Sequence, residues 1–215
     1  MSDGAQDLRV LAVCLGQAET RPGKKTKTGI NKHPTNKSVF VGFEGLDGDA
    51  VCNRKFHGGP EQAVYIEGDV SRLWWQKTLK IPIDHGQFGE NLCIEGLDNQ
   101  IVTVGDRFTA GDLVMEVTAP RMPCRVLFDK MGDAGFPRLY RNAARPGFYC
   151  RIIQPGLITA GTLARYVPYG GERISMPEMM SHHGQRVSPE LIARYQRVPV
   201  HAKLRASLSK SVIRF

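Results

Sequence analysis

The cysteine at position 124 has the surroundings of a reactive thiol. It follows the segment 119–123, Ala-Pro-Arg-Met-Pro, in which two prolines stiffen the backbone on either side of Arg121, and Arg125 follows it directly. Guanidinium charge close to a thiol lowers the thiol's pKa and favours the thiolate, which attacks electrophiles and binds soft metals. We therefore expect Cys124 to be a nucleophile or a metal ligand.

The other four cysteines predict no zinc site. Cys14, Cys93 and Cys150 each lie inside an apolar, strand-like run and are expected to be small buried hydrophobic residues. No cysteine lies within four residues of another, so the spacing of zinc ribbons and fingers is absent. An odd number of cysteines without a signal sequence favours free thiols and a cytoplasmic location.

Two glycine-rich segments, 45–49 (Gly-Leu-Asp-Gly-Asp) and 57–60 (His-Gly-Gly-Pro), bracket Arg54 and contain Asp49 and His57. Glycine lets the backbone approach a ligand closely, and histidine donates or accepts a proton near neutral pH. The alternative is a pair of tight turns whose aspartates cap their own backbone. The residues alone leave both interpretations open.

A basic loop precedes these turns. Segment 21–37 holds six Lys and Arg residues and no Asp or Glu, and its Lys27-Thr28-Gly29 could surround a phosphate with ammonium, hydroxyl and backbone N–H donors. The GxxxxGK[ST] spacing of a Walker loop is absent, so a solvated surface loop is the alternative. Segment 88–92 places Glu90 and Asn91 at a strand entry, where turn chemistry is again the alternative.

The elements that must position these residues are mostly short strands. Apolar alternation and Gly/Asp punctuation predict strands over 8–15, 39–43, 62–66, 107–109, 113–117, 148–153 and 162–167. Helical spacing predicts a helix over 69–79, with Asp69 as N-cap, and a short helix over 124–131. Segment 21–36 is expected to be a loop. We therefore predict a mainly β fold, a closed barrel with a few short helices.

The last 47 residues predict three short helices that form a small unit of their own, residues 169–215 after a barrel domain of residues 1–168. Ser175 and Glu178 have the spacing of a capping box, Ser188 precedes a proline suited to a first helical position, and Leu204 and Leu208 share one helical face. Such short helices bury little alone. We expect them to pack on the barrel or on another subunit.

Composition narrows the class of protein. The chain has 215 residues, and its 29 Lys and Arg against 21 Asp and Glu give a formal charge of +8, which calls for an anionic partner such as phosphate. No apolar run has the length that crosses a bilayer, so no membrane association is expected. The basic tail could lie on nucleic acid, but it lacks interleaved aromatic residues for base stacking, and we rank this partner lowest.

Taken together, the motifs resemble the MOSC domain, the molybdenum-cofactor sulfurase C-terminal type, in its YiiM-like subclass. The resemblance covers roughly residues 20–167 and depends on the order of several short motifs, each weak alone. The motifs lie at 27–32, 45–49, 57–65, 88–92, 105–108 and 120–124. The tail resembles the small three-helix domain of YiiM-like proteins.

The resemblance implies a β-barrel that binds a molybdopterin-type molybdenum cofactor, with the Cys124 thiolate as the metal ligand. It implies that Cys124, His57 and Asp49 are catalytic, the last two on the substrate side. It also implies that Lys27 and Thr28 hold the cofactor's phosphate and that Asn91 faces the pterin or the metal. The full set of cofactor-binding residues that it implies is Lys27, Thr28, Lys32, Arg54, His57, Asn91, Arg121 and Cys124.

The activity that the resemblance implies is reduction of N-hydroxylated substrates such as hydroxylaminopurine-type base analogues. The chain has no flavin or haem motif, so a separate reductase protein is expected to donate the electrons. The alternative is a non-enzymatic carrier that holds the cofactor or a sulfane sulfur on Cys124. A homodimer is compatible with the tail.

Overall fold

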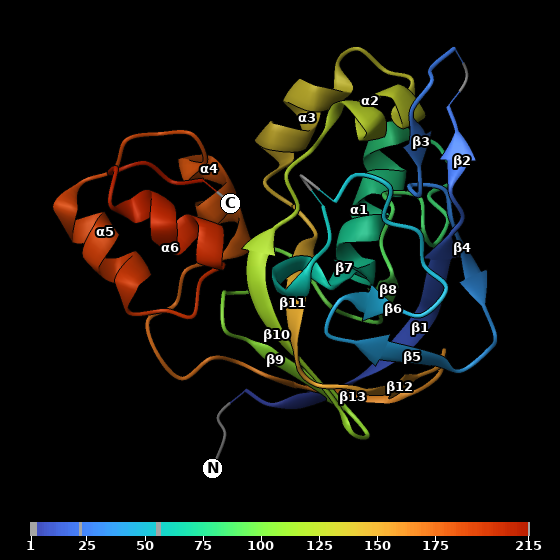
Figure 1. Ribbon diagram of the computed structural model, residues 1–215, viewed down its shortest axis with the longest axis horizontal. Coiled ribbons are helices and arrows are strands. Elements are labelled where there is room, and N and C mark those ends of the chain that lie inside the picture. Colours follow the sequence, from blue (N-terminus) through green and yellow to red (C-terminus); the bar gives the residue numbers. More distant parts are fainter. Residues whose placement is uncertain (1–3, 22, 55–56, 215) are drawn as a thin grey trace.

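The structure is a computed structural model that describes residues 4–21, 23–54 and 57–214. Its centre is the predicted closed barrel, in which strands follow the order β13-β9-β10-β11-β7-β8-β1 and β13 pairs back with β1 (Figure 1). The barrel strands are β1 (Gln6–Gly16), β7 (Val64–Gly68), β8 (Leu92–Ile94), β9 (Arg107–Ala110), β10 (Leu113–Pro120), β11 (Phe148–Gln154) and β13 (Leu163–Val167). The mainly β fold is thus confirmed.

Three smaller sets of strands surround the barrel. β4 (Lys32–Thr35) extends the sheet beyond β1. β5 (Val39–Gly42) pairs with β12 (Gly156–Ile158) on one side and β6 (Gly45–Leu46) on the other, and β2 (Glu19–Thr20) pairs with β3 (Lys27–Thr28). The expectation that 21–36 is only a loop is therefore wrong, because β3 and β4 find partner strands elsewhere in the sequence.

The barrel interior is filled by every second side chain of its strands. In β7, Val64 and Ile66 point into the apolar core, while Tyr65 and Glu67 face the opposite side. On that opposite side a second apolar cluster packs under the helices, and Trp75 stacks on Tyr140 with ring centroids 5.5 Å apart. Its helices are α1 (Asp69–Leu79), α2 (Arg125–Met131) and α3 (Phe136–Ala143).

Helix α1 connects β7 to β8, which run parallel, as a crossover between parallel strands requires. The predicted range of α1 is confirmed, but its N-cap residue is Gly68 and not Asp69. Asp69 lies in the first turn of the helix, where its carboxylate forms an ion pair with Arg72 at 2.9 Å. A single-turn 3-10 helix, η1 (Pro60–Gln62), precedes β7.

The tail forms the three predicted helices, α4 (Met176–His182), α5 (Pro189–Gln196) and α6 (Ala202–Leu208). Ser175 and Ser188 cap α4 and α5 by accepting backbone N–H bonds, as predicted. Each of the three helices contributes buried side chains to the same apolar cluster as the barrel, while Met180 of α4 joins the second cluster, so the tail packs on the barrel of its own chain. Asp106 ties the two together, since it accepts from Tyr166 Oη at 2.6 Å and from the backbone N–H of Tyr169 at 2.7 Å.

None of the helices in the described part of the chain combines the length and the apolar character that spanning a bilayer needs.

Candidate functional site

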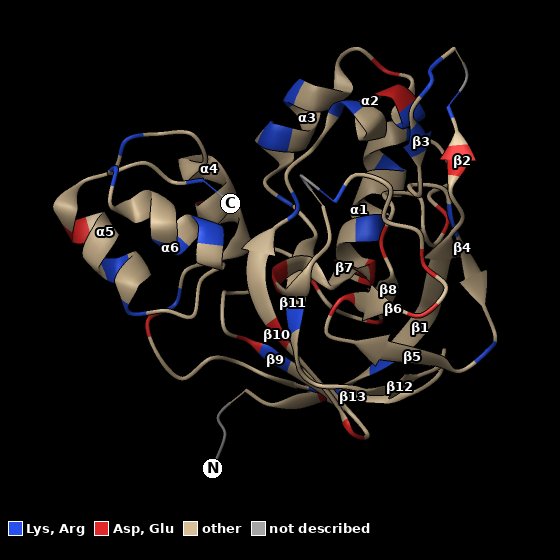
Figure 2. Cartoon of the chain, viewed as in Figure 1, with Lys and Arg blue, Asp and Glu red and all other residues tan. Residues whose placement is uncertain are grey.

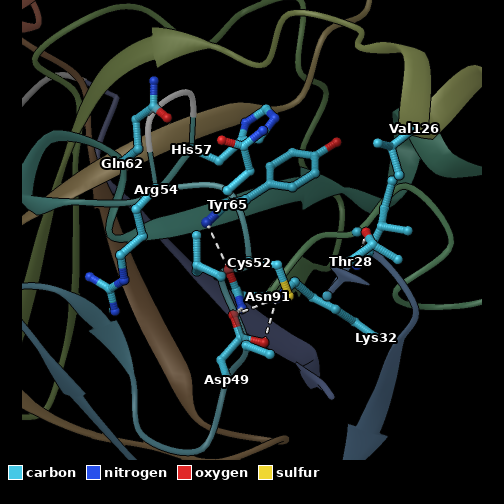
Figure 3. A pocket seen from close by; sticks show the side chains of 18 of the residues that line it. Thr28, Lys32, Asp49, Cys52, Arg54, His57, Gln62, Tyr65, Asn91 and Val126 are labelled. Carbon is cyan, nitrogen blue, oxygen red and sulfur yellow. Dashed lines mark hydrogen bonds and ion pairs between the residues drawn. The ribbon is translucent and has the colours of Figure 1, made fainter. Parts of the chain in front are cut away.

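A cavity of about 1000 Å³ opens beside the barrel, between the segment around β3, the β5–β6 hairpin and the start of α2 (Figures 1 and 3). It is at the upper end of the volumes of small-molecule sites. The site residues that the sequence predicts all line it, namely Lys27, Thr28, Lys32, Asp49, Arg54, His57, Asn91, Arg121 and Cys124.

Three of these residues form what we name the floor of the cavity: Lys32, Asp49 and Asn91. The Lys32 ammonium contacts both carboxylate oxygens of Asp49, and the two side chains are only 8% and 6% exposed. Asp49 also accepts from the backbone N–H of Gly16 at 2.8 Å and from Asn91 Nδ2 at 2.9 Å. Asn91 Oδ1 accepts from the backbone N–H of Tyr65 at 3.1 Å. The floor is thus fixed before any ligand arrives.

Two glycines let the backbone segments that carry the floor touch each other. A Cβ on Gly29 would lie 1.9 Å from the carbonyl oxygen of Ala50, and one on Gly16 would lie 2.3 Å from the oxygen of Gly29. Only residues without a side chain fit there. This close approach places Thr28 and Asp49, which come from separate motifs, on one cavity.

The two polar residues of the motif at 88–92, Glu90 and Asn91, have different roles. Glu90 is fully buried and accepts from the backbone N–H groups of Gly86 at 2.6 Å and Phe88 at 3.0 Å, so it holds its own loop rather than a ligand. Asn91 belongs to the floor. The alternative of turn chemistry therefore describes Glu90.

We name three further lining residues of the cavity, Gln62, Arg121 and Cys124, the wall. Cys124 is the N-cap residue of α2, and its sulfur lies 3.8 Å from Arg121 Nη2. Burial raises the pKa of a thiol, but here a hydrogen bond from His57 and the Arg121 charge outweigh burial and lower the pKa of Cys124 to about 6. Cys124 is therefore mostly thiolate at neutral pH.

The wall contains polar atoms without partners. Arg121 is 4% exposed; its Nη1 donates to the Met122 carbonyl at 2.6 Å, while its Nε has no hydrogen-bond partner among the described residues. Gln62 Oε1 is likewise buried and unpaired within the described part of the chain. Buried groups of this kind are costly unless a ligand or a water satisfies them. The wall, unlike the floor, is chemically incomplete by itself.

The cavity has two ends. Figure 3 shows Thr28, Lys32 and Val126 on one side and Gln62, Arg54 and His57 on the other. Arg54 is 67% exposed and pairs with Glu44 at 3.3 Å, so the structure does not bring it next to Thr28. Lys27, beside Thr28 in β3, remains as the exposed cation of the first end.

The basic loop is only partly at the cavity. Of its six cations, Arg21, Lys27 and Lys32 line the cavity, whereas Lys24 and Lys25 lie in the connection between β2 and β3, and Lys37 follows β4 (Figure 2). In the tail, Arg194 pairs with Glu172 at 2.9 Å and Glu178 at 2.7 Å. Arg197 also pairs with Glu172, so part of the tail's positive charge is balanced by acidic residues of the tail itself.

The remaining cysteines behave as predicted where they are buried. Cys14, Cys93 and Cys150 are fully buried, and burial raises the pKa of Cys14 to about 12. Cys52 is exposed and lines the same cavity as Cys124. The sequence interpretation missed Gln62, Phe43 and Cys52 as cavity residues, since no local pattern marks them.

Comparisons with known proteins identify sequences related to this chain. The MOSC domain profile matches residues 53–163. YflK from Bacillus subtilis is 32% identical over 169 residues, which is 78% of this chain and 76% of that protein. YiiM from Escherichia coli is 31% identical over 69% of this chain and 67% of its own. A protein named "Reductase" from Gibberella moniliformis is 30% identical over 65% of this chain, but the match spans 25% of that protein.

The solved structure of YiiM from Geobacillus stearothermophilus superposes with a TM-score of 0.77 at 24% identity, covering 95% of this chain and 98% of that one. At this level of identity the superposition shows a shared fold, the tail included.

Proposed function

The chain belongs to the MOSC domain family, and on that premise we propose that it is an oxidoreductase that binds a molybdenum cofactor and reduces N-hydroxylated compounds, with hydroxylaminopurine-type base analogues as substrates. The relative that bears the name "Reductase" supports an oxidoreductase role. A separate electron-donating protein would supply the electrons, because the sequence holds no flavin or haem motif.

The residues present fit such a cofactor. Cys124 offers a soft thiolate, which suits a molybdenum centre. The unpaired, buried Arg121 Nε offers a donor to an anionic or carbonyl oxygen of a pterin. Lys27 and Thr28, at the end of the cavity away from His57, would hold a terminal phosphate. When bound, the group would supply the two-electron chemistry that no side chain of this protein offers.

The chain's own residues would do the rest. Reduction of R–NH–OH to R–NH₂ consumes two electrons and two protons and breaks the N–O bond, and the oxygen leaves as water. His57, which lowers the pKa of Cys124, lies on the side of the cavity away from Thr28; this side would receive the substrate, and His57 would hand a proton to the leaving hydroxyl. The paired floor would hold the cavity open.

The observation that carries the proposal is the Cys124 thiolate on the wall of a large, partly unsatisfied cavity. The test is to reconstitute purified protein with the cofactor and measure bound molybdenum by elemental analysis. Wild type and Cys52→Ala, whose thiol lines the same cavity, should retain the metal, and Cys124→Ala should lose it. Loaded wild type with a chemical reductant should then convert hydroxylaminopurine to the amine. Equal metal in all three proteins, or no conversion, would contradict the proposal.

The same thiolate favours a second candidate, a carrier of sulfane sulfur or of the cofactor. A nucleophilic thiolate in an open cavity accepts a persulfide sulfur. Intact-mass measurement separates the two candidates. The mass of one added sulfur on Cys124, removed by a thiol reductant, together with absence of bound molybdenum would favour the carrier of sulfane sulfur, whereas bound molybdenum without reduction of the substrate would favour the carrier of the cofactor.

A further inference from the structure

We propose that Phe43 and Gln62 form a subsite that selects planar, base-like substrates over small aliphatic ones, Phe43 by stacking and Gln62 by accepting a hydrogen bond. The inference rests on the proposed function, because it concerns the substrate end of the same cavity. It assigns that end to two residues that the sequence motifs do not mark.

Phe43 occupies an unusual place for a large apolar side chain. It lies with Glu44 in the tight turn between β5 and β6, where Gly42 and Gly45 face each other as the closing pair. Turn positions favour Gly, Asn, Asp, Pro and Ser, yet this ring is 55% exposed and lines the cavity. A flat apolar surface at the mouth of a cavity is a stacking platform for a planar ligand.

Gln62 contributes a hydrogen-bond acceptor to the proposed subsite. Its backbone is fixed by η1, and its side-chain oxygen is buried without a partner among the residues that the structure describes. Figure 3 places the side chain on the same side of the cavity as His57 and Arg54. An amide oxygen in this position accepts a bond from an exocyclic amine or a ring N–H of a heteroaromatic base.

The turn that carries Phe43 lies close to Gln62 in the fold, because a Cβ on Gly45 would lie 3.0 Å from the carbonyl oxygen of Ala63, the residue after Gln62. Glu44, the neighbour of Phe43 in the turn, pairs with Arg54 at 3.3 Å, and Figure 3 shows Arg54 on the same side of the cavity as Gln62. The turn that carries the ring is thus tied to the segment that precedes His57. A purine analogue has both a π-face and N–H groups, whereas a small aliphatic hydroxylamine has no π-face.

The neighbouring strand provides a matched control. Phe40 lies three residues earlier in the same hairpin and is 44% exposed, but it pairs with Leu157 across β5 and β12 and does not line the cavity. Phe43→Ala therefore removes a phenylalanine side chain inside the proposed subsite, and Phe40→Ala removes one of similar exposure outside it.

The experiment has two readouts on the full chain. Equilibrium binding of adenine, which is not turned over, should weaken about tenfold in Phe43→Ala, the loss expected for one base–aromatic stack, and also in Gln62→Leu, while Phe40→Ala stays at wild type. In reconstituted protein, KM for hydroxylaminopurine should rise in Phe43→Ala while that for N-methylhydroxylamine stays within about twofold.

Equal effects of Phe40→Ala and Phe43→Ala on adenine binding, or equal losses for both N-hydroxylated substrates, would overturn the subsite. If adenine binding depends on Phe43 but neither substrate is reduced, the proposed function fails and the base-selecting subsite stands.

Discussion

The floor and the wall of the cavity are built from similar polar residues but differ in how completely these are paired. On the floor, Lys32, Asp49 and Asn91 satisfy one another and the adjoining backbone. On the wall, Arg121 Nε and Gln62 Oε1 are buried without a partner in the described residues. Completed networks make a site rigid, whereas incomplete ones leave room for a ligand's donors and acceptors.

Two thiols repeat the contrast. The backbone carbonyl of Cys14 accepts from the floor residue Asn91, and its thiol is buried in a small cluster with Ala12 and Cys93, where burial raises its pKa to about 12. Cys124, on the wall, is held near 6 by His57 and Arg121 against the effect of burial. The floor therefore shapes the cavity, and the wall carries its reactivity.

The largest expected effect is on thiol reactivity. Only the thiolate alkylates, so at pH 7 Cys124 should react with iodoacetamide at least about 10² times faster than Cys14, because the much smaller thiolate fraction of Cys14 outweighs the greater nucleophilicity of a thiolate of higher pKa. The rate at Cys124 should rise with pH and reach half its maximum near pH 6. Peptide mass spectrometry across pH 5–9 measures both sites. Similar alkylation rates at the two cysteines, or a midpoint near pH 9 for Cys124, would contradict a lowered pKa of the Cys124 thiol.

The next largest effect would break the floor. Lys32→Met leaves the Asp49 carboxylate buried without its cation and should reduce the free energy of unfolding by about 3–5 kcal/mol. Arg54→Met, which removes a cation from an exposed pair with Glu44 across the same cavity, should cost less than about 1 kcal/mol. Urea unfolding followed by fluorescence compares the two variants. A small, equal loss in both would show that the floor pair is not structural.

A third effect concerns a carboxyl group behind the wall. Glu67 is 1% exposed, accepts from Tyr65 Oη at 3.0 Å and Asn99 Nδ2 at 2.7 Å, and occupies space that a side chain on Gly147 would fill. Burial, with the nearby Glu90 charge, raises its pKa from 4.5 to about 8. The folded chain thus holds a proton that the unfolded chain releases between these pH values.

Stability should therefore fall as pH rises through that window, by about 3 kcal/mol between pH 5 and pH 8 from this group alone. Glu67→Gln, which mimics the protonated form, should remove this part of the decline and be more stable than wild type at pH 8. Urea unfolding of both proteins at the two pH values gives the difference. A parallel decline in the variant would mean that Glu67 is ionised in the folded protein.

The smallest effect sharpens the account of the wall. His57→Ala removes the hydrogen bond to the Cys124 sulfur and should move the midpoint of alkylation upward by about 1–2 pH units, without a change in unfolding free energy comparable to that of Lys32→Met. An unmoved midpoint would assign the low pKa to Arg121 alone.

Local patterns predicted most of the fold. Period-two alternation located the barrel strands, and the serines that cap α4 and α5 were recognised from spacing alone. The errors share one cause. β4 looks like a polar loop in sequence, and only its pairing with the end of β1, Gly16 opposite Lys32, makes it a strand and buries its lysine.

The site was predicted unevenly for the same reason. A low pKa of Cys124 was expected from its arginine neighbours in sequence, and Arg121 does contribute to it, but the larger lowering contribution is the hydrogen bond from His57, which lies 67 residues away in sequence. The Lys32–Asp49 pair and the unpaired Gln62 depend on segments that meet only in the folded chain, and no spacing reveals them. Phe43 was missed because a single aromatic residue in a turn carries no periodic signal.

The seam of the barrel has a consequence for biosynthesis. β13 closes the barrel against β1, with Gln6 opposite Tyr166. The first strand of the barrel to be synthesised therefore has this partner only after the last barrel strand has been made. Until then β1 and β9 are open edges, which are templates for intermolecular pairing. Contacts so distant in sequence fold slowly. A chain stalled before Leu163 should therefore aggregate rather than accumulate as a partial barrel.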